Sequence, residues 1–302
     1  MFRTTAPVRR PGEAQGAPAT APRVVRAARY APRGQGVPYE PVASREEFFR
    51  EMGVPYGAAF DRDGYASSGR RTSVELAHGA LDRLGPLGAH ESPEVVVVGY
   101  ASPDFDHAEL VASCLKRRLP GEPLSFALSD QGVLAPFSAL RVALEYARRC
   151  GFRRLLLMVV DQSTQPFAVP QSGQARVHED VAVALLIEWD GGGDAVRGMA
   201  HGRPSSGVFA AWDESVALVA GAGLDGAAPG TPGVPELPPQ TGALTRSEPG
   251  QPCTGVWTAL LEAPSGDRHT VVADYDRERD FLAYCMLDMG ELGTGDGFRR
   301  GA

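Results

Sequence analysis

Short runs that are apolar at every position limit this chain to a few kinds of fold. Val95–Gly99 and Leu155–Val160 are such runs, and Val181–Trp189 is predicted to form a further strand. Successive side chains of a β-strand point to opposite faces, so a run without polar positions must be covered on both faces. Neither run approaches the roughly 18 apolar residues of a membrane span. We therefore expect an α/β protein whose parallel-rich sheet lies between helices.

The segments between these strands carry helix signals. Thr72 and Glu75 have the spacing of a capping box, and apolar residues recur at helical spacing over Ala77–Leu84. Asp104 and Asp106 are expected to open the next helix, where acidic side chains are favourable. In chain order we predict a helix over 44–52, a helix over 72–84, a strand over 95–99, a helix over 104–119, a strand over 124–128, a helix over 136–149, and strands over 155–161 and 181–189. This alternation predicts a parallel sheet with right-handed crossovers.

The chain ends and the second half have a different composition. Residues 1–33 carry seven Arg and one Glu, mostly among Pro and Ala, and we expect a disordered tail. A strand is expected over 215–220, but Gly and Pro are abundant over 221–252, which predicts a long irregular segment. Order returns over 256–261, followed by a turn at 265–267 and strands over 270–273 and 281–287. We expect a first half over 34–190, a shortened and irregular second half over 191–290, and a flexible tail over 291–302.

Charge and cysteine content argue against several kinds of function. The arginines of the N-terminal segment are scattered and lack interleaved aromatic residues, on a chain of net charge −7, so we expect no nucleic acid partner. The sequence shows no export signal and no membrane span, so we expect a cytoplasmic protein. The cysteines lack metal-ligand spacing and are interpreted as thiols, of which only Cys253 lies in a loop rich in Gly and Pro. We expect no metal and no bound cofactor.

Several of these segments resemble one known family. Val97–Phe105 resembles a strand followed by a Thr-Pro-Asp-aromatic turn, and Cys150–Val159 resembles a helix end, a Gly, a basic pair and a strand that leads to an acidic residue, here Asp161. Arg45–Met52 and Thr72–Leu84 resemble two earlier segments of the same family. The order of elements is similar to that of the thiolase superfamily, and within it to type III β-ketoacyl-acyl-carrier-protein synthases. The resemblance implies a thiolase-like layered fold and pairing of two chains through the sheet edge of the first half.

The resemblance also implies a catalytic set of Cys, His and Asn, which this chain lacks. The family's nucleophilic Cys stands at the N-terminus of a buried helix, and that position falls at or near Val133. Shifting the alignment by one or two residues gives Gly132 or Gln131, and neither is a nucleophile. Ser129 and Asp130 lie earlier in the loop. Ser129 is a weak alternative nucleophile, and both residues are equally suited to turn hydrogen bonds.

The other functional loops of the family are altered as well. The His loop corresponds to 219–225, around Gly221, and the Asn loop to 250–254, where Gln251 keeps an amide and Cys253 is an alternative nucleophile. The family's Gly-Asp-Gly has become His178–Asp180, which we interpret as a surface turn and not as a metal or base cluster. Its last glycine-rich turn has become Asp274–Asp280, so charged residues replace glycines that allow close backbone approach. The residues expected to line the pocket loops are Gln131, Gly132, Gly221, Gln251 and Asp274.

Three functions remain open from the sequence. The first is a non-catalytic ketosynthase-like partner that binds an acyl group or a carrier protein in fatty-acid or polyketide-type metabolism, as a homodimer or as a heterodimer with an active ketosynthase. The second is an acyltransferase that acts on acyl thioesters through Ser129, Cys253 or Asp161. The third is a sensor that binds acyl-CoA in the old acyl pocket. Acyl-CoA or an acyl-carrier protein would be a substrate or ligand, not a resident cofactor.

Overall fold

The described residues of each half of the chain form five strands. The structure is a computed structural model, and it describes residues 21–33, 36, 38–102, 104–106, 108–167, 173–189, 199–204, 216–224, 235, 237, 243–263 and 269–289. The first half contains β1 (Arg23–Tyr30), β2 (Val95–Tyr100), β3 (Leu124–Leu128), β4 (Arg154–Asp161) and β5 (Val181–Glu188). The second half contains β6 (Met199–Gly202), β7 (Ala217–Ala220), β8 (Ala243–Arg246), β9 (His269–Asp276) and β10 (Phe281–Asp288).

The strands of both halves follow one topology. The first half has the order β3-β2-β4-β5-β1, in which β2 is parallel to β3 and β4, and β5 is antiparallel to β4 and β1. In the second half β7 is parallel to β8 and β9, and β10 is antiparallel to β9 and β6, so the order is β8-β7-β9-β10-β6. The halves join where β1 pairs with β10 at Arg23 and Asp288. The second half therefore retains the full strand set of the first.

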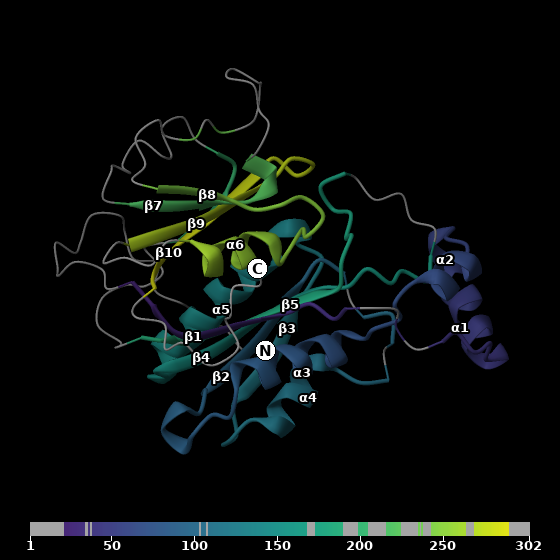
Figure 1. Ribbon diagram of the computed structural model, residues 1–302, viewed down its shortest axis with the longest axis horizontal. Helices are drawn as coiled ribbons and strands as arrows, with labels where there is room; N and C mark the ends of the chain where they lie inside the picture. The colour runs from purple at the N-terminus through teal and green to yellow at the C-terminus, as the bar shows by residue number, and fades with distance from the viewer. Residues whose placement is uncertain are drawn as a thin grey trace, which may run out of the picture.

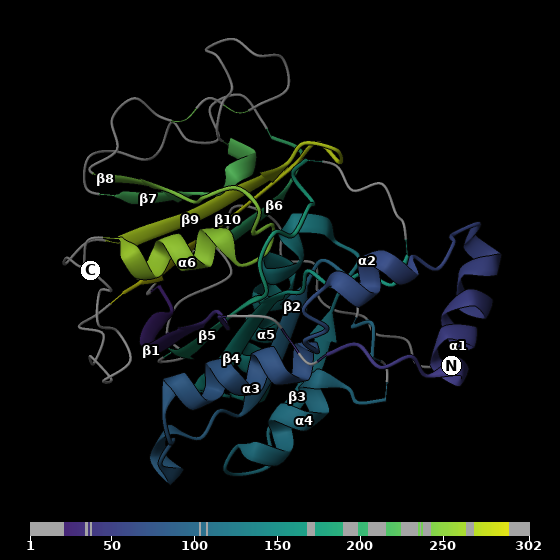
Figure 2. The same ribbon diagram turned by 45° about the vertical axis from the view of Figure 1, so that its right-hand side comes forward.

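Helices separate and cover these strands. They are α1 (Ala43–Gly53), α2 (Arg62–Ser67), α3 (Ser73–Leu84), α4 (Val111–Arg118), α5 (Ala135–Cys150) and α6 (Gly255–Glu262). Side chains of α3 and α4 form one buried cluster with one face of β2, β4 and β5. Figures 1 and 2 show α5 and α6 between the strands of the two halves, and α1 and α2 displaced to one side. In the described part of the second half, α6 is the only α-helix.

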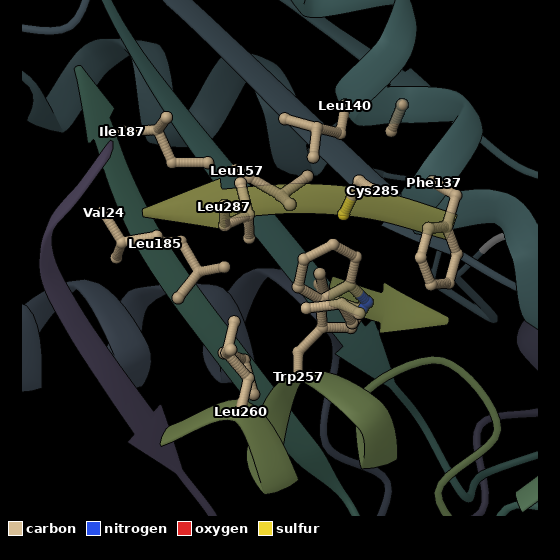
Figure 3. Close-up of a cluster of buried hydrophobic side chains, with 14 of the residues drawn as sticks. Val24, Phe137, Leu140, Leu157, Leu185, Ile187, Trp257, Leu260, Cys285 and Leu287 are labelled. Carbon is tan, nitrogen blue, oxygen red and sulfur yellow. The ribbon is translucent and has the colours of Figure 1, made fainter. Parts of the chain in front are cut away.

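The two central helices meet in the largest buried cluster. Phe137 of α5 and Trp257 of α6 are both buried, and their ring centroids are 5.2 Å apart. Each is the third residue of its helix, so the equivalent first turns of the two halves face each other. Figure 3 shows these side chains with Leu157, Cys285 and Leu287 from the neighbouring strands. Since the loops that precede α5 and α6 lead into these first turns, they are held close together.

Most of the predicted elements of the first half are confirmed. Thr72 Oγ1 accepts from Glu75 N at 3.1 Å, and Glu75 Oε2 accepts from Thr72 N at 2.9 Å, which is the predicted capping box at the start of α3. The predicted strand over 124–128 matches β3 residue for residue, and the helix over 136–149 is α5, which Gly151 ends in a left-handed conformation with φ +73°. Among the described residues, no helix is both long and apolar enough to cross a membrane.

Four predictions of secondary structure were wrong. Residues 23–30 are not a disordered tail, because β1 lies inside the sheet between β5 and β10. Asp104 does not open a helix; its carboxylate accepts from Ser73 N at the start of α3, and α4 begins only at Val111. The adjacent strands β4 and β5 are antiparallel although both are fully buried, so burial on both faces did not imply parallel pairing.

The fourth correction concerns the segment over 221–252, which was predicted to be irregular. It contains the edge strand β8, whose four residues pair in parallel with β7 and alternate between half-buried and exposed. The turn predicted at 265–267 lies outside the described residues.

Candidate functional site

The loops that precede α5 and α6 meet and define the candidate site. Val133 lies in a short helical turn, Gly132–Leu134, directly before α5, and it is 3% exposed. Cys253 lies two residues before α6, and its thiol donates to the carbonyl oxygen of Gly132 at 3.7 Å. Val133 and Cys253 therefore occupy equivalent positions before the two central helices. The first carries no reactive group, and the second is fully buried.

Asp161, the last residue of β4, anchors the loop before α6. Its carboxylate accepts from the backbone N–H of Cys253 at 3.0 Å, from that of Thr254 at 2.7 Å and from Thr254 Oγ1 at 2.7 Å. Burial raises the pKa of Asp161 to about 6, although the hydrogen bonds from Thr254 and Cys253 act in the opposite direction. These bonds occupy the carboxylate within the protein, so Asp161 positions the loop before α6.

The surroundings of Cys253 disfavour its thiolate form. Burial, followed by the negative charges of Asp161 and Asp274, raises the pKa of its thiol well above the ordinary value. The thiolate is the reactive form of cysteine, so a buried thiol with a raised pKa is inert. The side chain is also fully covered by its neighbours.

Asp274 occupies the space beside the loop over 221–224. Its Oδ1 accepts from Gly223 N at 3.0 Å and from Tyr275 N at 2.8 Å, and the residue is 4% exposed. A Cβ on Gly221 would lie 2.0 Å from Asp274 Cγ, so the carboxylate fits only because Gly221 has no side chain. The two positions, predicted separately as pocket loops, are thus in direct contact.

A charged turn packs against the loop before α5. Asp276 is 4% exposed over its side chain, and its carboxylate pairs with Arg279 at 2.8 Å. Both side chains approach Gly132 so closely that a Cβ there would lie 2.4 Å from Asp276 Oδ2 and 2.2 Å from an Arg279 nitrogen. Asp274 and Asp276 belong to β9, so the turn that was predicted to begin at 274 begins at Arg277.

A cavity of about 410 Å³ brings several predicted residues together. Among the predicted positions, Val133, Gln251 and Asp274 line it, and Gly221 adjoins the lining residue Ala222. The remaining described lining residues are Gly173, Gln174, Pro249, Gly250, Pro252, Arg277 and Glu278. The described lining contains no Ser, Cys or His, so it offers charged and amide groups but neither a thiol, a hydroxyl nor an imidazole.

Ser129 and Asp130 stand outside this cavity. Ser129 Oγ donates to the carboxylate of Asp130 at 2.7 Å, and Asp130 has a left-handed backbone conformation with φ +63°. Gln131 is exposed and accepts from Ser138 Oγ at 3.2 Å. The contact of Ser129 with a carboxylate, in place of an imidazole, fits the turn role that was the alternative prediction for this pair.

The segment His178–Asp180 borders the site as a turn. His178 N donates to Gly250 O at 2.8 Å, and Gln251 Nε2 donates to Glu179 at 3.4 Å. Asp180 accepts from Ser163 N at 2.7 Å and from Ser163 Oγ at 2.8 Å. The three residues therefore bond to different neighbours, His178 through its backbone and Glu179 and Asp180 through their carboxylates.

Two contributors to the site belong to the loops over 250–254 and 274–280 that the sequence selects, but neither was predicted individually. Thr254 fixes Asp161 through both its backbone and its hydroxyl, and a Thr directly before a helix was an available signal. Arg279 lies over Gly132 through its ion pair with Asp276. Sequence spacing carried no sign of that contact, because Gly132 and Arg279 are brought together only by the packing of the two halves.

The paired halves, the two central helices and the meeting of their preceding loops define the thiolase-like fold of type III ketosynthases and related condensing enzymes. A β-ketoacyl-[acyl carrier protein] synthase III from Thermus thermophilus superposes with a TM-score of 0.53 at 13% identity, over 89% of this chain and 99% of that chain. The enzyme from Pseudomonas aeruginosa gives 0.52 at 13% identity, over 90% of this chain and 99% of that chain. A priming β-ketosynthase from a polyketide biosynthetic pathway gives 0.52 at 14% identity, over 92% and 98% of the two chains. No protein-family model and no curated protein sequence matches the chain.

Proposed function

We propose that this chain is a non-catalytic, ketosynthase-III-like subunit that binds an acyl group or a carrier protein in fatty-acid or polyketide-type metabolism in the cytoplasm. The observation that carries the proposal is the loop before α5. Its buried Val133 stands where the family resemblance expects the nucleophile, and the ion pair of Asp276 with Arg279 packs against the adjacent Gly132. A condensing enzyme forms a thioester at this point of the fold, and a valine side chain cannot do so.

The surrounding residues support the same proposal. The thiol of Cys253 is buried with a raised pKa, and Asp161 is hydrogen-bonded to the loop before α6. A cavity of about 410 Å³ is nevertheless present between the two halves. A cavity without a nucleophile in its described lining favours binding over turnover.

We further propose that two chains pair through β3. This strand lies at one end of the strand order, and it carries Leu124, which is 40% exposed. On the adjacent helix Tyr146 is 45% exposed, and its ring centroid lies 5.7 Å from that of the half-buried Phe126. An open strand edge flanked by apolar side chains is a template for pairing with another chain. The partner would be a second copy or an active ketosynthase, and neither nucleic acid nor membrane is needed.

Intact-mass analysis tests the non-catalytic role. The full chain is incubated with acyl-CoA and, separately, with acyl-carrier protein, and an active ketosynthase serves as the positive control. The proposal predicts no covalent adduct on this chain and co-elution with the ketosynthase or the carrier protein. An adduct that Ser129→Ala abolishes would establish the acyltransferase alternative and refute the proposal. Reversible stabilisation by acyl-CoA, with neither adduct nor protein partner, would instead support the sensor.

A further inference from the structure

A second and larger cleft lies beside the candidate site. It has a volume of about 1030 Å³ and is built from the segment after β1, the loop between α2 and α3, and the turn before β5. Four of its lining residues are arginines, namely Arg29, Arg33, Arg70 and Arg71, and its lining acids are Glu179 and Asp180. The lining therefore has an excess of positive charge on a chain whose net charge is −7.

Arg70 builds the wall of this cleft. Its Nη1 donates to the carbonyl oxygens of Tyr65, Ala66 and Ser68 at 3.1, 2.5 and 2.8 Å. Its guanidinium also stands 5.7 Å from the ring centroid of Tyr39, and its backbone is left-handed with φ +48°. These contacts fix the loop before α3, which places the next residue, Arg71, at the cleft.

The other three arginines of the cleft, Arg29, Arg33 and Arg71, are weakly paired within the described part of the chain. In the part of the chain that the structure describes, the side chains of Arg33 and Arg71 make no ion pair or hydrogen bond. Arg29 pairs with Glu179 only at 3.8 Å, and its Nε is buried without a hydrogen-bond partner among the described residues. Three guanidinium groups thus face one cleft with most of their donors available.

The acidic residues of the cleft also accept hydrogen bonds from neutral groups. Asp180 Oδ1 accepts from the backbone N–H of Ser163 at 2.7 Å and from the Ser163 hydroxyl at 2.8 Å. Glu179 also accepts from Gln251 at 3.4 Å. The lining holds four guanidinium groups against two carboxylates, and this excess of positive charge favours binding of an oxyanion by forked N–H donors.

We propose that this cleft binds a phosphorylated small molecule through Arg29, Arg33 and Arg71. A phosphate offers several charged oxygens to forked donors, and the volume leaves room for a group beyond one phosphate. The inner wall of the cleft is the turn His178–Asp180, whose other contacts are Gly250 and Gln251 of the candidate site. The cleft is nonetheless separate from the cavity that contains Val133, since the two share no described lining residue.

Calorimetric titration of the full chain with pyrophosphate and with inorganic phosphate tests this proposal. Pyrophosphate is expected to bind, more tightly than phosphate, and the affinity is expected to fall as NaCl is raised. Replacing both Arg33→Gln and Arg71→Gln is expected to weaken pyrophosphate binding about tenfold or more, because two charge-assisted contacts are lost. The matched control is Arg83→Gln, which removes one exposed positive charge from the end of α3 and is expected to leave the affinity unchanged.

The outcomes separate this proposal from the proposed function, because no carrier protein, acyl group or partner chain is present. No pyrophosphate binding by the wild-type chain, or equal weakening in Arg83→Gln, would overturn it. Should the double variant lose its circular dichroism signal, the single variant Arg33→Gln, at an exposed position, provides the test, and unchanged affinity in that folded variant would also overturn it. The phosphodiester of a carrier protein's prosthetic group is a second source of the bound phosphate. Displacement of pyrophosphate by the holo form of the carrier protein, but not by its apo form, would identify that source.

Discussion

The pH dependence of stability should report directly on Asp161. Its pKa is about 6 in the folded chain, against 3.8 for an exposed carboxyl, so the folded state holds its proton to higher pH than the unfolded state does. The stability that this group contributes is fully present below about pH 3.8 and is lost as the pH rises towards 6. A pH unit of difference in pKa is worth about 1.4 kcal/mol, so the full loss is about 3 kcal/mol.

Asp161→Asn removes the titratable carboxyl, so comparing the variant with the wild type measures how much stability depends on the titration of Asp161. The asparagine amide still accepts hydrogen bonds through its one oxygen. Its NH₂ group cannot replace the carboxylate as acceptor for the backbone and hydroxyl donors of Thr254. The variant is therefore destabilised by the same free energy at every pH. Relative to the variant, the wild type should lose about 2 kcal/mol between about pH 4.5 and about pH 7.5. Urea unfolding at several pH values measures this difference, with Glu122→Gln, whose side chain is 87% exposed, as the control.

The shape of the two stability curves decides the outcome. Curves for the wild type and Asp161→Asn that run parallel from pH 4.5 to pH 7.5, within about 0.5 kcal/mol, would refute a buried carboxyl with a raised pKa. The same divergence in Glu122→Gln would show that the effect is not specific to Asp161.

Two further predictions concern the packing of the site and the sheet edge. Gly221→Ala should destabilise the fold by about 1 to 3 kcal/mol in thermal unfolding, because the new Cβ would meet the buried carboxylate of Asp274, while Gly173→Ala, with no atom within 4 Å of its Cβ, should change little. Equal effects of the two would argue against close packing of Asp274 on Gly221. Leu124→Arg on β3 should shift the chain to the monomer in light scattering, whereas Leu244→Arg on the β8 edge, at 42% exposed, should leave the oligomer intact. Loss of the oligomer only in the second variant would place the interface at the other edge.

The fold was predictable where one signal dominated a segment. The apolar runs over β2 and β4 and the capping box at Thr72 each left a single physical solution. In β1, by contrast, Val24 and Ala28 are buried, but Arg23, Arg26 and Arg29 flank and separate them, so arginine content concealed the inward-facing residues. The repeat of the two halves was equally hidden, because β6 and β8 have only four residues each and carry too little pattern.

The site was predictable as a set of loops but not as a set of contacts. Gly221 and Asp274 were both selected, but their contact depends on how the strand end of β9 meets the loop after β7. The approach of Arg279 to Gly132 joins residues from different halves, and local spacing cannot encode it. Burial also decided the chemistry of Cys253, which looked accessible in a loop rich in Gly and Pro and is fully covered.

Acylation of a restored nucleophile tests the central claim most directly. Val133→Cys is incubated with acyl-CoA beside the wild type and an active ketosynthase, and the mass of each intact chain is measured. We predict no acyl adduct on either form of this chain, because position 133 is buried, Asp276 and Arg279 pack on the adjacent Gly132, and the described cavity lining supplies no imidazole base. An adduct on the wild-type chain, or rapid acylation of Val133→Cys, would contradict the claim that this site binds without turning over.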